Sequence, residues 1–425
     1  MLLNQAYHLS YCTNIHPGET WQEIFDNLVR YLPGIKKTLS PEKPFGIGLR
    51  LSDVASQELL EQNKLQQFRK WLDDIGLYVF TLNGFPYGGF HRQVVKDAVH
   101  QPDWTTTERA AYTIRLATIL AALLPESMAG GISTSPLSYK PWYTGKPDQL
   151  EQVFYTSTAH LVQVIQALQS IKEATGKTIH IDLEPEPDGL LENTGEVIRY
   201  FQDRLLPQGI KTLMASSNLE ETEAREVILE HLQLCYDVCH FALAYEEPVT
   251  AFARLKAAGI KIGKIQLSAA LKVQLPPGTA ARKAVAETLA PFAESTYLHQ
   301  VVERSINGQL IHYTDLPLAL QHIQKPEARE WRTHFHVPLF TASYNKLLST
   351  QDDIVKVLAL LQQDQITQHL EVETYTWEVL PEGLKKDVSE SIQRELDWVI
   401  HTLNQTHHAE NGRIERSRAH AVTDR

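Results

Sequence analysis

Short apolar runs of strand length alternate with longer amphipathic stretches along almost the whole chain. In one such stretch Leu65, Phe68, Leu72 and Ile75 recur at helical spacing and share one face. The alternation of strands and helices is typical of βαβ units around a parallel sheet. The sequence predicts eight strands, at Tyr7–Cys12, Gly46–Leu51, Tyr78–Asn83, Met128–Thr134, Thr178–Glu184, Leu232–Asp237, Lys261–Leu267 and His369–Tyr375.

Eight parallel strands with intervening helices either close into a barrel or spread as an open sheet. An open sheet that binds dinucleotides carries a glycine-rich phosphate loop after its first strand, and no such loop follows residues 7–12. The sequence therefore predicts an α/β fold of the (β/α)8 TIM-barrel type.

The regular spacing breaks after Leu267, because about a hundred residues precede the last strand, far more than an ordinary connection needs. Three segments within these hundred residues have the pattern of extra strands: Tyr297–Glu303, 309–313 and His334–Phe340. We expect an insertion at about 270–344 that forms a β-hairpin lid over one mouth of the barrel.

The rest of the chain fits one domain followed by a tail. Residues 1–404 are predicted to form a single barrel domain that includes the insertion. Residues 405–425 show no apolar periodicity and many polar side chains, so we predict a disordered C-terminal tail.

Composition and charge narrow the class of protein. Hydrophobic residues make up 43% and charged residues 21% of 425, which excludes disordered and low-complexity classes. The formal net charge of −11 disfavours a nucleic-acid partner bound through its phosphates. Three cysteines indicate a reducing compartment, and no signal peptide or apolar run of about 18 residues is present. We expect a cytoplasmic protein with no membrane span.

Polar residues recur at every second position of several predicted strands. His180, Asp182 and Glu184 share one face of the fifth strand, and the apolar residues between them face the other way. The apolar row must face the helices, because unpartnered charges pressed against helices would cost several kcal/mol each. The polar row therefore points into the barrel, and Glu371 and Glu373 repeat this arrangement on the last strand.

Four of these inward residues lie at the carboxyl ends of their strands, where active sites of this fold are built. They are Glu184, Asp237, Gln266 and Glu373, and His240 follows Asp237 by three residues. Carboxylates with an imidazole suit Mn²⁺, Mg²⁺, Fe²⁺ or Zn²⁺. Each residue alone would be interpreted as a buried, hydrogen-bonded structural group, but four strand ends together favour a metal or substrate site.

Further polar residues are candidates for binding a substrate. His91 ends a loop rich in aromatic residues and glycine that begins at Asn83. This composition suits either a substrate-binding loop or a plain turn. His334 and His336 either complete a metal cluster or lie on a solvated edge. The candidate substrate-binding residues are His8, Asn83, His91, Asp182 and His336.

The order of these residues resembles that of the xylose isomerase-like barrel superfamily, which includes sugar isomerases and epimerases and the zinc-dependent abasic-site endonucleases (AP endonuclease family 2). Metal ligands there run Glu, then Asp with His three residues on, then His, then Glu. The resemblance maps them to Glu184, Asp237, His240, Gln266 and Glu373 and covers most of residues 5–404. Gln266 departs from the pattern, since a glutamine oxygen is a weaker ligand than histidine.

Four segments are also similar to EboE-type metabolite traffic proteins, which accompany prenyltransferase-type genes in secondary-metabolite clusters. These segments are residues 83–91, 95–104, 132–140 and 184–189. The similarity implies delivery or processing of a small-molecule precursor, with other proteins of the same biosynthetic cluster as candidate partners.

Three functions follow from these observations. In an isomerase or epimerase, Glu184 and Glu373 would be the catalytic pair, with one divalent metal ion holding a small polyhydroxylated or carbonyl metabolite. A multi-zinc phosphodiester hydrolase would recruit His91, His336 and Glu184 as extra ligands. A non-catalytic metabolite carrier on a former enzyme scaffold is the third, and Gln266 favours it.

Overall fold

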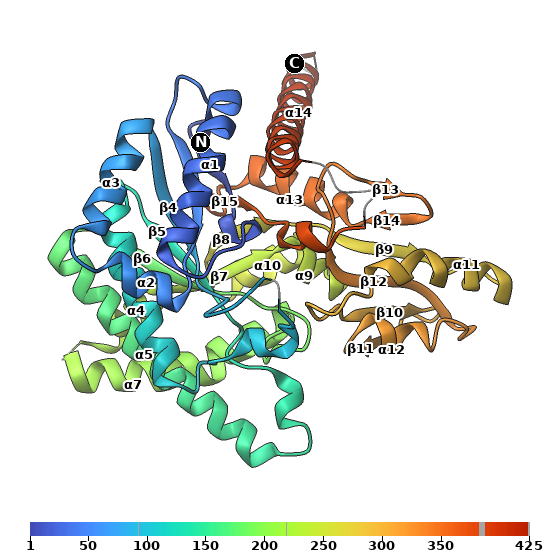
Figure 1. Ribbon diagram of the computed structural model, residues 1–425, viewed down its shortest axis with the longest axis horizontal. Coiled ribbons are helices and arrows are strands. Elements are labelled where there is room, and N and C mark those ends of the chain that lie inside the picture. The colour runs from blue at the N-terminus through green and yellow to red at the C-terminus, as the bar shows by residue number, and fades with distance from the viewer. Residues whose placement is uncertain (92, 218, 382–386, 424–425) are drawn as a thin grey trace.

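The computed structural model describes residues 1–91, 93–217, 219–381 and 387–423, with side chains as far as residue 405. At its centre is a nine-stranded sheet in the order β1-β2-β15-β8-β7-β6-β5-β4-β3. A parallel bridge between Cys12 and Gly48 joins the two ends of this sheet, so that it closes into a barrel (Figure 1). The predicted TIM-barrel fold is confirmed.

Each predicted strand overlaps one strand of the barrel. The barrel strands are β2 (Tyr7–Tyr11), β3 (Phe45–Arg50), β4 (Leu77–Asn83), β5 (Gly130–Thr134), β6 (Ile179–Leu183), β7 (Leu232–Asp237), β8 (Ile262–Leu267) and β15 (His369–Val372). These strands pair in parallel, and the short β1 (Leu2–Leu3) is antiparallel to β2. The largest difference is at β15, which ends three residues before the predicted Tyr375, because a 3-10 helix (Tyr375–Val379) begins there.

Helices cover the outside of the barrel and bury their apolar faces against it. On α5 (Pro147–Thr175), Leu161, Ile165 and Leu168 are fully buried. The other helices are α1 (Trp21–Leu39), α2 (Asp53–Leu59), α3 (Lys64–Ile75), α4 (Thr107–Leu123), α6 (Thr194–Tyr200), α7 (Leu206–Ser217), α8 (Glu221–His231), α9 (Val238–Leu243), α10 (Pro248–Ala257) and α13 (Gln351–Gln363). Thr20 and Glu23 form a capping box at the start of α1, which fixes where that helix begins.

The insertion between β8 and α13 forms a second sheet beside the barrel (Figure 1). Its order is β11-β10-β12-β9-β14-β13, and its pairs are antiparallel. Its elements are β9 (Ala270–Gln274), α11 (Thr279–Leu289), β10 (Val301–Ser305), β11 (Leu310–Tyr313), α12 (Leu316–Leu320), β12 (Ala328–His336), β13 (Ser343–Tyr344) and β14 (Leu347–Ser349).

This sheet is larger than the predicted hairpin. The hairpin is present as β10 and β11, but β12 begins at Ala328, six residues before the predicted His334. The difference has a physical cause: β12 is held by strands on both sides, so pairing rather than its own apolar pattern sets its length.

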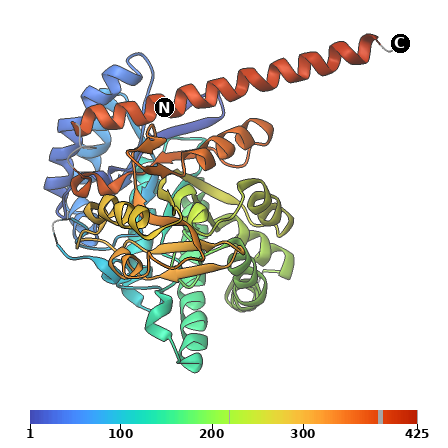
Figure 2. The same cartoon turned by 90° about the vertical axis from the view of Figure 1, so that its right-hand side faces the viewer.

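The last helix, α14 (Val388–Thr423), packs against the body of the protein with its first half only. Ile392, Leu396, Val399 and Leu403 are buried at helical spacing. The second half projects away from the barrel (Figure 2). The sequence predicts a disordered tail from residue 405, whereas the helix continues to Thr423, because a helix already nucleated by packing extends at little cost. Within the described part of the chain, no helix has both the length and the apolar character needed to cross a membrane.

Candidate metal centre

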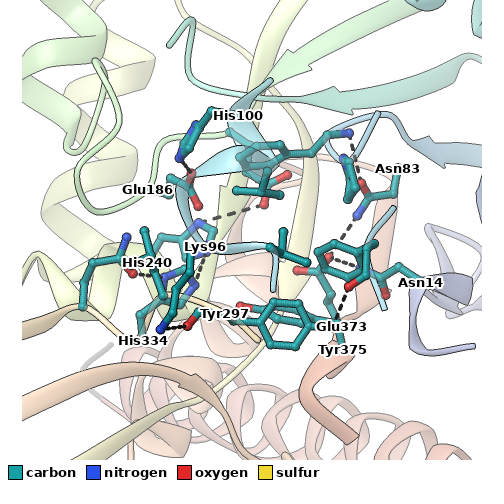
Figure 3. A pocket seen from close by; sticks show the side chains of 18 residues that line it. Asn14, Asn83, Lys96, His100, Glu186, His240, Tyr297, His334, Glu373 and Tyr375 are labelled. Atoms are coloured by element: carbon teal, nitrogen blue, oxygen red, sulfur yellow. Dashed lines mark hydrogen bonds and ion pairs between the residues drawn. The ribbon is translucent and has the colours of Figure 1, made fainter. Parts of the chain in front are cut away.

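A small cavity of about 60 Å³ lies at the carboxyl ends of the barrel strands. Figure 3 shows Asn14, Asn83 and Glu373 on one side of it and Glu186, His240 and His334 on the other. The remaining lining residues are Phe85, Pro86, Phe90, Val95, Lys96, Val99, His100, Glu184, Tyr297, Leu298, Gln300 and Tyr375.

Three carboxylates converge beside this cavity. Oxygen atoms of Glu184, Asp237 and Glu373 lie within 4.8 Å of one another, and all three residues are buried. Glu184 Oε2 and Asp237 Oδ2 have no hydrogen-bond partner. Unpartnered buried carboxylate oxygens are costly, and a bound cation would supply the missing partner. The three residues therefore fit a divalent metal ion.

Neighbouring groups fix the orientation of these carboxylates. Glu373 Oε1 accepts hydrogen bonds of 2.9 Å from both Asn14 Nδ2 and Asn83 Nδ2. Asp237 is the N-cap of α9, and its Oδ1 accepts from the His240 backbone N–H at 3.1 Å and from Ser268 Oγ at 2.7 Å. Their remaining oxygens are therefore held in place before any ligand arrives.

The electrostatics of the three carboxylates differ. Burial, together with the neighbouring Glu373 and Asp237 carboxylates, raises the pKa of Glu184 well above its ordinary value. Burial also raises the pKa of Glu373, with Asp237 and Glu371 adding to the effect. For Asp237, burial is outweighed by His240, His336 and its hydrogen bonds, so that its pKa is lowered. Without a cation, these surroundings favour proton binding at the two glutamates and disfavour it at Asp237.

Three histidines adjoin the carboxylates. His240 Nε2 lies 3.1 Å from His334 Nε2, and the His336 ring is 5.6 Å from the His334 ring. Ligand atoms of Asp237, His240 and His336 form a second group within 4.8 Å, and those of Glu186, His240 and His334 form a third. His334 and His336 are buried at 5% and 0% exposure, so the alternative of a solvated edge is wrong.

Gln266 occupies the seventh-strand position of the predicted ligand set. It lies in register with Asp237, and its Oε1 accepts a hydrogen bond of 2.7 Å from Cys235 Sγ. Gln266 does not line the cavity. Because its side-chain oxygen already accepts the hydrogen bond from Cys235, this geometry does not support a role for Gln266 as a metal ligand, which stays a prediction.

The predicted substrate-binding residues separate into two groups. Asn83 lines the cavity, and His336 lies beside it in the second group of ligand atoms. His8, Asp182 and His91 do not line it. His8 and Asp182 lie too far inside the barrel to reach the cavity at its mouth. A strand rises about 3.3 Å per residue, and Asp182 lies two residues before Glu184. His8 lies four residues before Cys12, the last inward-facing residue of its strand.

His8 and Asp182 have other partners inside the barrel. His8 Nδ1 lies 2.8 Å from Tyr78 Oη, and His180 Nδ1 lies 2.7 Å from Asp182 Oδ1. Both side chains therefore lie inside the barrel, away from this cavity, and their direct contact with a substrate stays a prediction.

His91 connects two loops at the rim. Its Nε2 lies 2.6 Å from the Asn14 carbonyl oxygen, and its Nδ1 lies 3.2 Å from Tyr297 Oη. These contacts hold His91 between the two loops, and its role in substrate binding stays a prediction.

Loops from the barrel and the insertion together cover the cavity. The backbone N–H groups of Val95 and Lys96 donate to the Thr296 carbonyl oxygen at 2.7 and 3.0 Å. The Phe90, Tyr297 and Tyr375 rings pack together with centroids 5.1 to 5.4 Å apart. This part of the insertion therefore closes one side of the site, as the lid prediction expected.

Sequence reasoning missed several lining residues. His100 Nε2 lies 3.0 Å from Glu186 Oε1, and both side chains are buried. Glu186 follows Glu184 by two residues at the end of a strand, a position that could have indicated it. His100, Asn14 and Tyr297 lie on loops and short turns, where periodicity gives no signal.

Comparisons with known proteins give matches among solved structures only. No protein-family model and no curated protein matches the chain. A xylose isomerase-like TIM-barrel protein from Mycobacterium smegmatis in complex with magnesium is similar at 9% identity, with 95% of this chain and 97% of that chain covered and a TM-score of 0.48.

Two further solved structures are similar. A D-tagatose 3-epimerase-like protein matches at 9% identity, with 94% and 99% coverage and a TM-score of 0.48. The probable 3-DHS dehydratase AsbF from Bacillus anthracis matches at 14% identity, with 92% and 97% coverage and a TM-score of 0.41. The similarity to EboE-type proteins is matched by none of these comparisons and stays a prediction.

Proposed function

We propose that this protein is a divalent-metal-dependent enzyme of the isomerase or epimerase type that acts on a small polyhydroxylated or carbonyl metabolite. The observation that carries the proposal is the convergence of the buried Glu184, Asp237 and Glu373 at the carboxyl end of the barrel, where Glu184 and Asp237 each have an unpartnered oxygen. Such a group is expensive to maintain without a ligand, so its presence argues for a working site.

The ligands in this proposal are the three carboxylates, with His240 at their edge. His240 lies 3.9 Å from both Glu184 Oε1 and Asp237 Oδ1. A set rich in oxygen suits Mn²⁺ or Mg²⁺, and one imidazole also admits Fe²⁺ or Zn²⁺. When bound, a cation of this kind polarises a carbonyl or hydroxyl oxygen of the substrate.

Glu184 and Glu373 are the proposed catalytic pair. They come from β6 and β15, on different sides of the barrel mouth. Both amide donors bind Glu373 through the same oxygen, Oε1, which leaves Oε2 to receive or return a proton. One glutamate would remove a proton from the carbon next to the substrate carbonyl. The other would return a proton, to the opposite face of the same carbon in an epimerase or to the neighbouring carbon in an isomerase.

The proposed biological setting is supported by a sequence resemblance and by the cysteines. The resemblance to EboE proteins supports a role in the traffic or processing of a secondary-metabolite precursor, with proteins of the same cluster as partners. The cysteines Cys12, Cys235 and Cys239 are buried free thiols, which suits the reducing cytoplasm.

The proposal is tested by the metal content of the gently purified protein. We expect about one equivalent of Mn, Mg, Fe or Zn in the wild-type protein at the carboxylate set, and its loss in Glu184→Gln/Glu373→Gln. Glu303→Gln is the matched control, because Glu303 is equally buried but bonds to Trp331 and Tyr313 in the insertion.

The other outcomes distinguish the alternatives. A folded protein that takes up no metal, even after incubation with Mn²⁺ and Zn²⁺, would overturn the proposal and favour a carrier. Bound metal that survives in the double variant would show that these glutamates are structural groups.

A further inference from the structure

A second, larger cavity lies at the opposite mouth of the barrel, where the strands begin. Its volume is about 960 Å³, which is the size of a pocket for a small organic ligand. Its wall includes residues at or next to the first residue of five barrel strands: Ala129, Thr178, Gln233, Ile262 and His369. Among the described residues, none lines both this cavity and the one at the carboxyl ends, so the two are separate.

Two histidines line this amino-end cavity from inside the barrel. His180 on β6 and His369 on β15 are only 4% and 3% exposed, and their rings stack with centroids 5.6 Å apart. The interior of a TIM barrel is ordinarily filled by branched apolar side chains. Two buried imidazoles at this level therefore call for polar partners.

Each ring has one nitrogen that is left as an acceptor. His180 Nδ1 lies 2.7 Å from Asp182 Oδ1, which accepts its proton, so Nε2 is the unprotonated nitrogen of the neutral ring. His369 forms a hydrogen bond with the Ala129 backbone, whereas its Nδ1 is buried without a partner. Because a backbone oxygen only accepts, His369 donates through Nε2 and its Nδ1 is the acceptor.

Two glycines make room for this arrangement. A Cβ atom at Gly263 would lie 2.0 Å from Asp182 Oδ1, and one at Gly131 would lie 2.8 Å from His180 Cε1. Gly263 is also skipped in the pairing of β7 with β8, which makes it a β-bulge. Bulges are over-represented next to functional sites. The backbone at this mouth is therefore shaped around a polar pair rather than around an apolar layer.

Neighbouring polar side chains do not satisfy the two histidine nitrogens. Thr367 Oγ1 donates instead to the Gly263 backbone oxygen at 2.7 Å. Gln233 Nε2 donates to the Glu230 backbone oxygen at 2.9 Å. A ligand that binds here must therefore bring hydrogen-bond donors to two acceptors.

Much of the remaining wall is apolar. Phe252, Leu255 and Ile260 line the cavity and are buried, whereas Val249 lies at its rim and is exposed. The cavity therefore opens to solvent and combines an apolar wall with a few polar groups, which is the usual composition of a small-molecule site.

We propose that this cavity binds a small molecule with an apolar body and a nitrogen head that donates hydrogen bonds, either a primary amine or a primary amide. One such head has the two donors that His180 Nε2 and His369 Nδ1 require, whereas a hydroxyl has only one. The apolar body lies against Phe252 and Ile260. This inference does not depend on the proposed function, because the two cavities are separate.

The test uses saturation-transfer NMR on the full-length protein with three probes of similar size. Benzylamine and benzamide carry nitrogen donors, whereas benzoate carries only acceptors at neutral pH. We expect at least one nitrogen probe to bind with a Kd of about 1 mM or below, and benzoate to bind at least about tenfold more weakly. Binding of benzylamine alone identifies a charged head, and binding of benzamide alone identifies a neutral one.

Two variants locate the bound probe. His369→Leu removes one acceptor and should weaken binding at least about tenfold. Val249→Trp fills the rim from an exposed position on α10 and should weaken it similarly, which keeps the test decisive if His369→Leu fails to fold. Val54→Trp is the matched control, because Val54 is an exposed valine on α2 that does not line the cavity, and it should bind like the wild-type protein.

Several results would contradict the proposal. These are no binding of either nitrogen probe at millimolar concentrations, benzoate binding as tightly as the nitrogen probes, and binding left unchanged by the cavity variants. Binding that survives Val249→Trp but is lost in Glu184→Gln/Glu373→Gln would place the probe at the carboxyl-end mouth and would also overturn it. The metal content that tests the proposed function is measured independently of all these results.

Discussion

Lys264 and Glu371 form an ion pair at the centre of the barrel, beneath the candidate metal centre. The Lys264 Nζ to Glu371 Oε2 distance is 2.7 Å, and neither side chain is exposed to solvent. Burial works to lower the pKa of Lys264, but Glu371 outweighs it and keeps the lysine charged. Gly48 leaves room for the carboxylate, since a Cβ there would lie 1.7 Å from Glu371 Oε1.

Removing one partner of this pair should destabilise the protein strongly. We expect Lys264→Met to lower the free energy of unfolding by about 3–5 kcal/mol, because it leaves a buried carboxylate unpaired. Urea denaturation followed by circular dichroism measures this change. Lys256→Met is the control: its ion pair with Asp364 is exposed and should contribute less than about 1 kcal/mol.

The double variant Lys264→Met/Glu371→Leu separates charge from packing. It should recover much of the lost stability, because no unpaired charge remains. A double variant as unstable as Lys264→Met would mean that the loss comes from packing instead.

At the scale of elements, α14 is attached to the barrel through a buried glutamate. Glu395 Oε1 accepts hydrogen bonds from the Leu339 backbone N–H at 3.1 Å and from Thr374 Oγ1 at 2.7 Å. Burial raises the pKa of Glu395 to about 7. The protonated form is therefore the one that the folded protein favours.

The pH dependence of α14 docking follows from that shift. The stabilising effect of Glu395 is complete below its unfolded pKa of about 4.3 and is lost as the pH rises to about 7. Glu395→Gln keeps an acceptor oxygen but cannot ionise. We expect the variant to be more stable than the wild-type protein by about 1–3 kcal/mol at pH 8.

Thermal unfolding at two pH values measures this difference. At pH 4 the variant and the wild-type protein should unfold at similar temperatures. A stabilisation that is the same at pH 4 and pH 8 would show that ionisation of Glu395 is not its cause.

The barrel strands could be predicted because each one carries its own signal. In β6 the apolar residues Ile179, Ile181 and Leu183 alternate with inward polar residues, and the same period places Glu184 at the mouth. The insertion gives a weaker signal, because the length of β12 depends on pairing with β9 and β10. Strand periodicity shows that a side chain points inward but does not fix its depth, so it could not place His8 along the barrel axis.

At the scale of the whole molecule, the site is made by two separate sheets, the barrel and the sheet inserted between β8 and α13. Glu184, Asp237 and Glu373 come from the barrel, whereas His334 and His336 come from the insertion. The contribution of the barrel could be predicted from strand ends alone. The contact between His240 and His334 could not, because it depends on how the inserted sheet packs against the mouth.

The central claim is that the mouth of the barrel binds a divalent cation through Glu184, Asp237 and Glu373. Anomalous diffraction from crystals soaked in Mn²⁺ tests it most directly, because it locates the ion rather than counting it. We predict an anomalous peak about 2.0–2.2 Å from oxygens of these three residues. A well-ordered site with no peak there, or with Mn²⁺ only on surface carboxylates, would contradict it.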